Sequence, residues 1–532
     1  WRTREARPVN AQAVGRGQPV ALASLGAGQK LLAFASMCVG MFIALLDIQI
    51  VSASLRDIGG GLSAGADETV WVQTSYLIAE ILVIPLSGSL PGVFSTRWLL
   101  TCSAIGFTLA SLLCGLAWDI HSMIAFRALQ GFLGGSMIPM VFTAAFIFFE
   151  GKQRVIAAAT IGAIASLAPT LGPALGGWIT DHASWHWLFS INLVPGPLVA
   201  ILVFRLVNID KADLSLLRGA DYLGMVLLAL FLGCLQYTLE EGPRWDWFGD
   251  RTILITAWIA GLSGIAFVMR TLTYAQPLVD LRALRDRNFA LGSLFSFVTG
   301  IGLFATIYLT PLFLGRVRGY SALQIGEAVL STGVFQILTV PVYAWLARRF
   351  DLRWILMVGM ALFAISMWEF APITHDWGAR ELLFPQALRG MAQQLAVPPV
   401  VTLTLGGLAP ARLKLASGLF NLMRNLGGAI GIAACSTILN DRTNLHFQRL
   451  AEHLNSTNEA LALWMTGAAA RLGTTADEAV LRPLWQATYR EAQTQAYADA
   501  FLVIMAAFIL TVLLVPLMRK VAPLGAPSAD SH

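Results

Sequence analysis

The chain has 532 residues, of which 56% are apolar and only 13% are charged, and its formal net charge is +5. A soluble domain carries about a quarter charged residues, so this composition excludes a soluble enzyme, a disordered chain and a fibrous protein. Apolar runs of about twenty residues predict membrane-spanning helices, and the strands of an outer-membrane barrel would alternate instead. The positive charge is typical of basic cytoplasmic loops, and nucleic acid is not expected as a partner.

Taken in chain order, the predicted elements are those of an all-α polytopic membrane protein with about 14 transmembrane helices. A cytoplasmic tail occupies residues 1–30, a six-helix bundle 31–207, and two inserted helices with linkers 208–289. A second six-helix bundle covers 290–518, and a cytoplasmic tail covers 519–532. The predicted spans are 31–55, 70–90, 98–117, 121–148, 155–179, 187–207, 221–239, 252–273, 290–314, 324–346, 354–371, 380–403, 416–438 and 498–518.

The distribution of Lys and Arg predicts the orientation in the membrane. An even number of spans places both termini on one side, and most of the basic loops share that side, which is therefore the cytoplasm. The largest basic cluster contains Arg270, Arg282, Arg285 and Arg287.

The longest external loop, 440–497, has the apolar periodicity of helices, and its second half is predicted to continue into the last span. Two interpretations stay open for this loop. It is an amphipathic cap lying at the membrane surface, or a docking surface for a periplasmic partner.

Three motif pairs occur in the same order in two parts of the chain. The pairs are Gly88–Arg97 with Ala344–Arg353, Gln130-Gly131 with Arg389-Gly390, and Gly172-Pro173 with Gly427-Gly428. The register of the pairs predicts two parallel six-helix halves. Such repeats are typical of transporters that rock around a central site.

Five segments together resemble one family: Leu46–Val51, Arg127–Gly131, Pro169–Gly177, Trp187–Asn192 and Gly319–Gly326. On these motifs the chain resembles the major facilitator superfamily, in its fourteen-helix drug:proton antiporter branch of the EmrB/QacA type. The resemblance implies the major facilitator fold and a proton gradient as the energy source, with no cofactor and no metal. The turn after the second span departs from the family, because Gly92, Val93 and Ser95 replace its usual Asp, Arg and Gly.

Ionisable residues inside spans are costly and are therefore functional candidates. Burial of Asp47 disfavours its charged form and a nearby Arg would favour it, and the resemblance matches Asp47 to a proposed proton-coupling site. Arg127 is implied to face the first span, beside Gln130 and Gly131 of the same motif. Glu80 is a second protonation site, a carboxylate that attracts cations, or a packing residue. The competing interpretation of Asp47 and Arg127 is fixed packing of charges.

Two further groups of candidates concern the gate and the substrate. The small-residue motif resembles the family's gate against proton leak, with plain close packing as the alternative; it contains Pro169, Gly172, Pro173, Gly176 and Gly177. An apolar central cavity is expected to be lined by Tyr76, Phe304 and Tyr308. Arg389 and Arg424 bind an anionic substrate, or pair with lipid headgroups and helix ends.

The sequence thus predicts a proton-coupled multidrug efflux antiporter of the bacterial inner membrane that exports amphipathic small molecules by alternating access. A periplasmic membrane-fusion adaptor and an outer-membrane channel are candidate partners beside protons and lipid. The alternatives are a proton-coupled exporter of a specific metabolite or aromatic acid, and a non-transporting membrane receptor. No nucleophile–base pair or metal motif is found, so enzymatic activity is not expected.

Overall fold

The computed structural model describes residues 26–52, 54–219, 221–274, 279–408, 410–454, 459–472 and 477–520. Most of the two predicted tails lies outside these ranges. Within them the chain forms helices and no strands, which confirms the predicted all-α class. Thirteen helical segments of this described part are long and apolar enough to cross a membrane.

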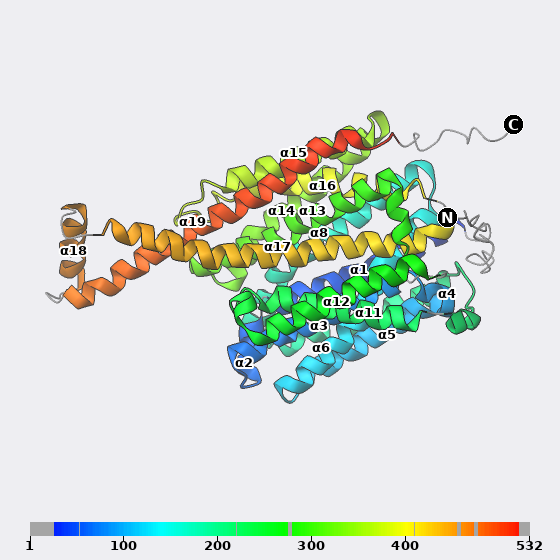
Figure 1. Cartoon of the computed structure of the whole chain (residues 1–532), viewed down its shortest axis with the longest axis horizontal. Helices are drawn as coiled ribbons and strands as arrows, with labels where there is room; N and C mark the ends of the chain where they lie inside the picture. Colours follow the sequence, from blue (N-terminus) through cyan, green and yellow to red (C-terminus); the bar gives the residue numbers. More distant parts are fainter. Residues whose placement is uncertain are drawn as a thin grey trace, which may run out of the picture.

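Two bundles make up most of the structure (Figure 1). We call the first group of helices the N-terminal bundle: α1 (Ala27–Ser52), α3 (Ala66–Leu86), α5 (Thr96–Gly115), α6 (Ile120–Gly135), α7 (Met137–Phe148), α8 (Gly151–His182) and α10 (Pro195–Leu206). We call the second group the C-terminal bundle: α13 (Arg287–Arg316), α14 (Ala322–Arg349), α15 (Leu352–Phe370), α16 (Leu383–Leu405), α17 (Pro410–Glu452) and α19 (Asp477–Leu514). Short helices α2 (Leu55–Gly61), α4 (Leu90–Phe94) and α9 (His186–Ser190) connect members of the first bundle.

The helix α16 is not among the thirteen apolar segments, although a span was predicted there at 380–403. It is 23 residues long and packs against α13, α14 and α15. Its polar side chains are buried in protein, so they do not meet lipid; they are Gln386, Arg389, Gln393 and Gln394. This helix therefore occupies the place of the predicted twelfth span, and the predicted fold of about fourteen spans holds.

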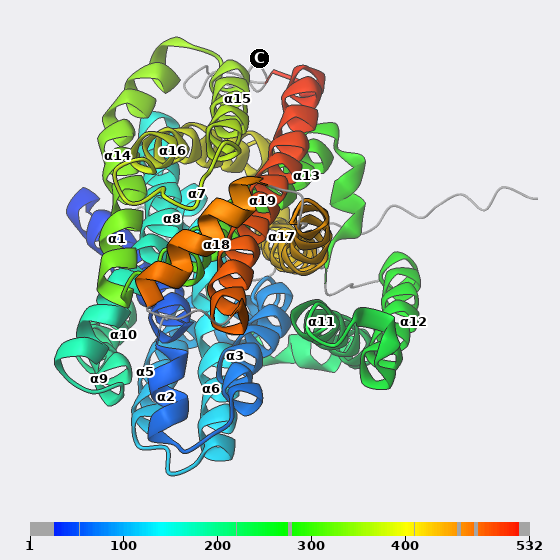
Figure 2. The same cartoon turned by 90° about the vertical axis from the view of Figure 1, so that its left-hand side faces the viewer.

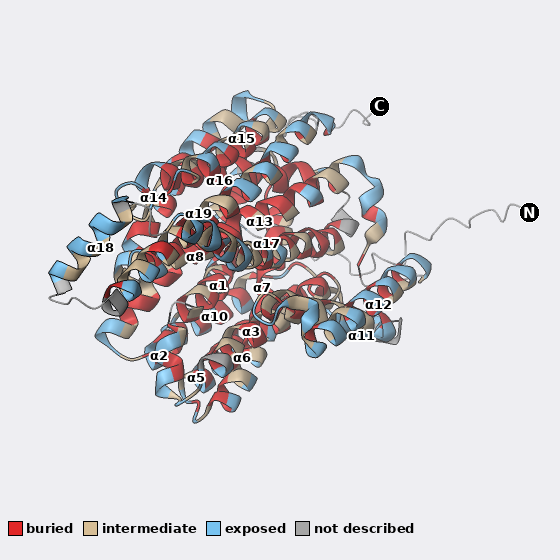
Figure 3. Ribbon diagram, turned by 60° about the vertical axis from the view of Figure 1, so that its left-hand side comes forward, coloured by how far each residue is buried: buried red, intermediate tan, exposed pale blue. Residues whose placement is uncertain are grey.

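The bundles meet mainly where α8 crosses α14 and α16, and where α17 crosses α3 and α7. Buried residues follow these contacts through the centre, and exposed residues lie on the periphery and at the helix ends (Figure 3). Many peripheral side chains are large and apolar, as lipid-facing side chains must be. Examples on one outer helix are Trp258, Leu262, Ile265 and Met269.

Each bundle is tied at the turn before its third helix by an arginine of the repeated motif. Arg97 donates from Nε to the carbonyl of Val207, just after α10, at 2.8 Å. Arg353 donates from Nη1 to the carbonyl of Met518, just after α19, at 3.0 Å. Both arginines thus join the third helix of a bundle to the end of its last helix. This match between the halves supports the internal repeat, and neither bond crosses from one bundle to the other.

The helices α11 (Tyr222–Glu241) and α12 (Arg251–Thr273) form a pair at the side of the molecule (Figure 2). They pack on each other, and α11 also contacts α3 and α17. Where α11 begins and α12 ends, the buried carboxylate of Asp221 accepts a hydrogen bond from the Gly224 amide at 2.9 Å. The same carboxylate forms an ion pair with Arg270 Nε of α12 at 2.7 Å. Asp221 therefore caps one helix and holds the other.

Replacing Asp221 with Ala is expected to destabilise this pair by about 1–3 kcal/mol, because a helix cap and a partly buried charge-assisted bond are both lost. A fall in the melting temperature of the detergent-solubilised protein would measure it. Asp213→Ala is the matched control, because the Asp213 carboxylate accepts from the amide and the hydroxyl of its neighbour Ser215, while its backbone bonds to Gly92 and Val93 remain in the variant. Equal melting temperatures of the two variants would contradict the assignment.

The predicted external loop 440–497 is largely helical and is not a cap on the bundle. The helix α17 runs without a break for 43 residues, and α19 for 38, so both project beyond the other helices (Figure 1). The helix α18 (Glu459–Leu472) lies at the tip. The continuation of the loop's second half into the last span is confirmed, and the continuation of α17 at the other end was not predicted. Residues 455–458 and 473–476 lie outside the described ranges.

Aromatic and ionic contacts join the two helices of this projecting hairpin. The rings of Trp485 and Tyr489 stack at 4.9 Å, and Phe447 of α17 packs against both. His446 Nε2 lies 2.9 Å from the Asp499 carboxylate closer to the bundle. These side-chain contacts explain why the extension holds together outside the helical bundles.

Candidate functional site

The centre of the N-terminal bundle contains a fully buried ion pair. Asp47 of α1 and Arg127 of α6 lie with Oδ2 and Nη1 2.5 Å apart, and neither side chain is exposed. A buried charge without a partner would cost several kcal/mol, so each group requires the other. The structure thus brings together the two residues that were predicted as a coupling pair.

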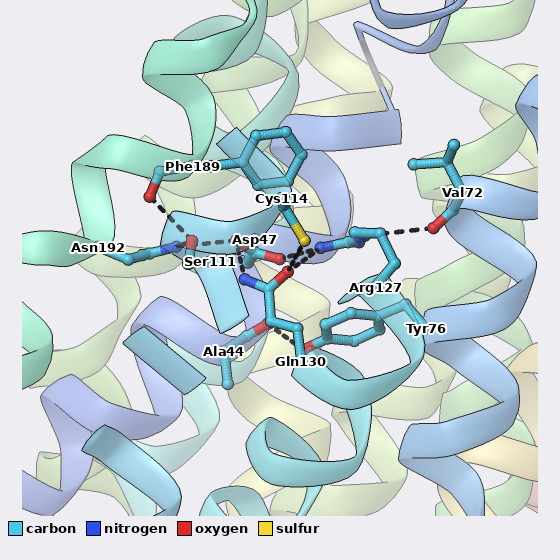
Figure 4. A network of polar contacts seen from close by, with 10 residues as sticks. All are labelled: Ala44, Asp47, Val72, Tyr76, Ser111, Cys114, Arg127, Gln130, Phe189 and Asn192. Atoms are coloured by element: carbon cyan, nitrogen blue, oxygen red, sulfur yellow. Dashed lines mark hydrogen bonds and ion pairs between the residues drawn. The ribbon is translucent and has the colours of Figure 1, made fainter. Parts of the chain in front are cut away.

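Two amides complete the shell around the Asp47 carboxylate (Figure 4). Gln130 Nε2 donates to Oδ1 at 3.0 Å, and Asn192 Nδ2 donates to the same oxygen at 2.8 Å. Gln130 also accepts from Arg127 through Oε1 at 2.7 Å, and Asn192 donates to Ser111 Oγ at 3.0 Å. One cation and two neutral donors therefore surround the carboxylate.

The helix α3 fixes the orientation of Arg127 from the other side. Arg127 Nε donates to the Val72 carbonyl at 3.2 Å, and its guanidinium lies 4.3 Å from the centre of the Tyr76 ring. A Cβ on Gly131 would stand 2.3 Å from the Tyr76 carbonyl oxygen. Only glycine permits this approach of α6 to α3, so the motif Arg127–Gly131 sets the depth of the arginine.

The ion pair between Asp47 and Arg127 joins α1 to α6. Asn192 ties the same carboxylate to the segment that leads into α10. One buried carboxylate therefore connects three parts of the N-terminal bundle.

Glu80 occupies α3 one turn beyond Tyr76 and is 4% exposed. The helix α3 that carries Glu80 packs against α17, which carries Arg424. Arg424 is itself buried, and its guanidinium lies 5.4 Å from the ring of Phe142 in the other bundle. Glu80 and Arg424 are thus buried on two helices that meet at the interface between the bundles, whereas Asp47 has its cation within one bundle.

In the C-terminal bundle α16 packs on α14 as α6 packs on α3 in the N-terminal bundle. The arginine occupies a different position of the repeated motif. Residues 386–390 read Gln-Ala-Leu-Arg-Gly where residues 127–131 read Arg-Ala-Leu-Gln-Gly. A Cβ on Gly390 would stand 2.2 Å from the Thr332 carbonyl oxygen, as Gly131 approaches Tyr76. Gln386 Nε2 donates to the Ala328 carbonyl at 3.1 Å, which corresponds to the bond from Arg127 to Val72. The two sites are therefore structural repeats in which Arg and Gln exchange places.

The small-residue motif of α8 packs directly against the part of α1 that follows Asp47. A Cβ on Gly172 would stand 2.3 Å from Gln49 Cβ, and one on Gly176 would stand 2.5 Å from the Ile50 carbonyl oxygen. Pro169 and Pro173 lie within the same helix. Gly177 is buried, and its carbonyl accepts from Thr180 Oγ1 at 3.1 Å.

The three aromatic residues predicted to line a cavity have different surroundings. Tyr76 is fully buried inside the N-terminal bundle, under Arg127. Phe304 packs against Gly428 of α17, and Tyr308 lies one turn further along α13, which packs against α17. Tyr76 therefore belongs to the Asp47 network, while the other two lie at the contact of α13 with α17.

Asn192 is a site residue to which the sequence analysis assigned no role. It is 2% exposed, and it reaches Asp47 from the start of the helical segment that leads into α10. A signal existed in the sequence, because an amide that follows the apolar stretch Trp187–Ile191 needs a buried partner. The identity of that partner required the fold.

Two repeated helical bundles, each with a buried arginine and glutamine in the same motif, define the class of this protein as a polytopic membrane transporter. Comparisons with known proteins agree. The family model described as Major Facilitator Superfamily matches residues 37–432 and 292–527. The chain therefore belongs to the major facilitator superfamily.

Two curated relatives resemble the chain over most of its length. The Colistin resistance protein EmrB of Acinetobacter baumannii is 38% identical over 470 residues, which cover 88% of this chain and 92% of the relative. The Multidrug export protein EmrB of Escherichia coli K12 is 31% identical over 427 residues, which cover 80% and 83%. These relatives confirm the expected resemblance to the EmrB type.

A solved structure supports the fold alone. The proton:xylose symporter XylE, with a bound sugar analogue, superimposes with a TM-score of 0.61 at 12% identity. The match covers 93% of this chain and 97% of that one.

Proposed function

We propose that the chain is a proton-coupled multidrug efflux antiporter of the bacterial inner membrane, with both termini in the cytoplasm. The observation that carries the proposal is the buried Asp47–Arg127 pair with its two amide donors. The names of the relatives support drug export, and the basic cytoplasmic loops support the orientation. The energy source is the proton gradient, and no cofactor is required.

In this mechanism the proton and the substrate favour different arrangements of the two bundles. A proton on Asp47 releases Arg127 and loosens the contact between α1 and α6. Deprotonation restores the ion pair and stabilises the other arrangement. If the substrate binds one of these two arrangements more tightly than the other, it is exchanged for the proton. The contact of α8 with α1 at Gly172 and Gly176 acts as the gate, because it links the Asp47 helix to the helix that crosses into the C-terminal bundle.

The expected partners are amphipathic small molecules, protons and lipid. A periplasmic membrane-fusion adaptor with an outer-membrane channel is part of the proposal. The projecting hairpin of α17, α18 and α19 is the exposed element that such an adaptor would contact first.

The proposal predicts that amphipathic drugs move protons through the purified protein. The protein is reconstituted in liposomes that enclose a pH-sensitive dye, and cationic, neutral and anionic amphipaths are added in turn. At least one class should cause a proton flux that depends on protein and has the sign opposite to drug movement. Binding of amphipaths without any proton flux would overturn the antiporter function and favour a receptor. Proton flux with the anionic compounds alone would favour the exporter of a specific acid.

A further inference from the structure

The charges buried in the two bundles do not balance. Among the described residues of the bundles, the buried charged groups are three guanidiniums and two carboxylates; they are Arg127, Arg389, Arg424, Asp47 and Glu80. Asp47 pairs with Arg127, and Glu80 and Arg424 lie on α3 and α17, which pack against each other. One positive charge is left over, on Arg389.

Arg389 is fully buried and only partly hydrogen-bonded. Its Nη2 donates to Thr332 Oγ1 at 2.8 Å and to Gln386 Oε1 at 3.1 Å. Its Nε and Nη1 have no partner among the described residues. No ion pair is found for it in the same part of the chain. A guanidinium has five donors in a planar fork, and the fork here is left half open.

Among the described residues, no acid of the helices that pack on α16 is bonded to Arg389. The sequences of α13 and α16 contain no Asp or Glu. The one acid of α14, Glu327, is exposed near its outer end, and the one acid of α8, Asp181, is also exposed. The one acid of α15, Glu369, is next to the last residue of that helix. In the N-terminal bundle the repeated position belongs to Gln130, which donates to the Asp47 carboxylate. The C-terminal bundle thus repeats the polar position without an acid bonded to it.

The site is close to the interface that must open during transport. Thr332, which accepts from Arg389, is one turn before Gln336, and Gln336 Nε2 donates to the Gly162 carbonyl of α8 at 3.2 Å. Gln394 of α16 donates to the Ala159 carbonyl of α8 at 3.4 Å. Separation of the bundles breaks these two bonds and uncovers the layer next to Arg389.

From these contacts we infer that Arg389 binds the acidic headgroup of an anionic amphipathic substrate, which takes the place that Asp47 has in the other bundle. The open edge of the guanidinium, Nε and Nη1, accepts a carboxylate as a planar two-oxygen ligand. The apolar tail of such a substrate would lie between the bundles. This inference rests on the proposed efflux function and specifies one substrate class for it.

The test compares two amphipaths of equal chain length and opposite charge, decanoate and decyltrimethylammonium. Binding to the purified full-length protein in neutral detergent is measured by calorimetry for the wild type and Arg389→Gln. Removal of a charge-assisted bond should weaken decanoate binding roughly 10- to 100-fold. Decyltrimethylammonium binding should not change. Arg348→Gln, an exposed arginine of the same bundle, should bind both compounds like the wild type.

A stability readout separates a binding role from a structural one. Without ligand, Arg389→Gln should melt at the same temperature as the wild type or higher, because an unpaired buried charge is removed. Decanoate should raise the melting temperature of the wild type and not that of the variant. A large fall in the unliganded variant, together with unchanged decanoate affinity, would show a structural residue and overturn the inference.

Further outcomes are equally decisive. If Arg389→Gln does not fold, Arg389→Lys carries the test, and its decanoate affinity should be weakened because a point charge replaces the fork; equal affinity would overturn the inference. If chloride raises the melting temperature of the wild type as much as decanoate does, the assignment of an amphipathic ligand is overturned. Proton flux with decyltrimethylammonium and unchanged decanoate affinity in the variant would reject this site alone. Decanoate binding that depends on Arg389, without proton flux for any compound, would reject the antiporter function and keep the site.

Discussion

Asp47→Asn is expected to abolish drug-dependent proton flux and to lower the stability of the folded protein by about 3–5 kcal/mol. The amide keeps the shape of the carboxylate but leaves Arg127 buried without its counter-ion. It also cannot release a proton, so the exchange stops even where the variant still binds drug. Proton flux into proteoliposomes and thermal melting in detergent measure the two effects separately.

A double variant distinguishes folding from coupling in this experiment. Asp47→Asn combined with Arg127→Gln removes both charges, so stability should recover while proton flux stays absent. The control is Asp57→Asn, an exposed acid on α2 beyond the outer end of the same helix, which should behave like the wild type. Proton flux that survives in Asp47→Asn would move the coupling site to Glu80 and contradict the mechanism proposed for the Asp47–Arg127 pair.

Gly176→Ala is expected to have the second largest effect. The added Cβ would stand 2.5 Å from the carbonyl oxygen of Ile50, and a backbone atom cannot turn aside as a side chain can. The helices α1 and α8 must therefore separate, at a cost of about 1–3 kcal/mol. Because Ile50 is three residues from Asp47, the shift also displaces the carboxylate from Arg127. Drug export should fall more steeply than the melting temperature does.

The matched control for this prediction is Gly261→Ala in α12. A Cβ there has no atom within 4 Å, and alanine favours a helix by about 1 kcal/mol over glycine. This variant should melt at the wild-type temperature or slightly above it and should export normally. Normal drug export by Gly176→Ala would show that the α8 motif serves close packing only.

The positions of most helices were predictable because lipid imposes long apolar segments. The same rule is weak for α16, whose glutamines and Arg389 face protein instead of lipid. The rule of long apolar segments also does not predict the projecting hairpin. Beyond its apolar part α17 continues with polar residues, and this part of the helix is held by contacts with α19. Tertiary contacts such as that of Phe447 with Trp485 decide this region.

The coupling pair was predictable because Asp47 and Arg127 are charged residues inside spans, where chance placement is costly. The amide of Asn192 was missed because a neutral side chain leaves no such mark in the sequence. The exchange of Arg and Gln between residues 127–131 and 386–390 can be found by comparing the two sequences. The bonding partners of the exchanged residues, Thr332 and Ala328, follow only from the packing of α14 against α16.

The uninterrupted course of α17 has a mechanical consequence. At 1.5 Å per residue its 43 residues span about 65 Å from its first residue, Pro410, to the tip of the hairpin. A rotation of about 10° about the first residue would carry the tip roughly 10 Å sideways. Because α17 packs along α13 and α19, it cannot tilt independently of them. The helix is therefore a lever that converts a small tilt of one bundle into a large displacement of the projecting hairpin, and a spin label or a fluorophore at the tip would record it.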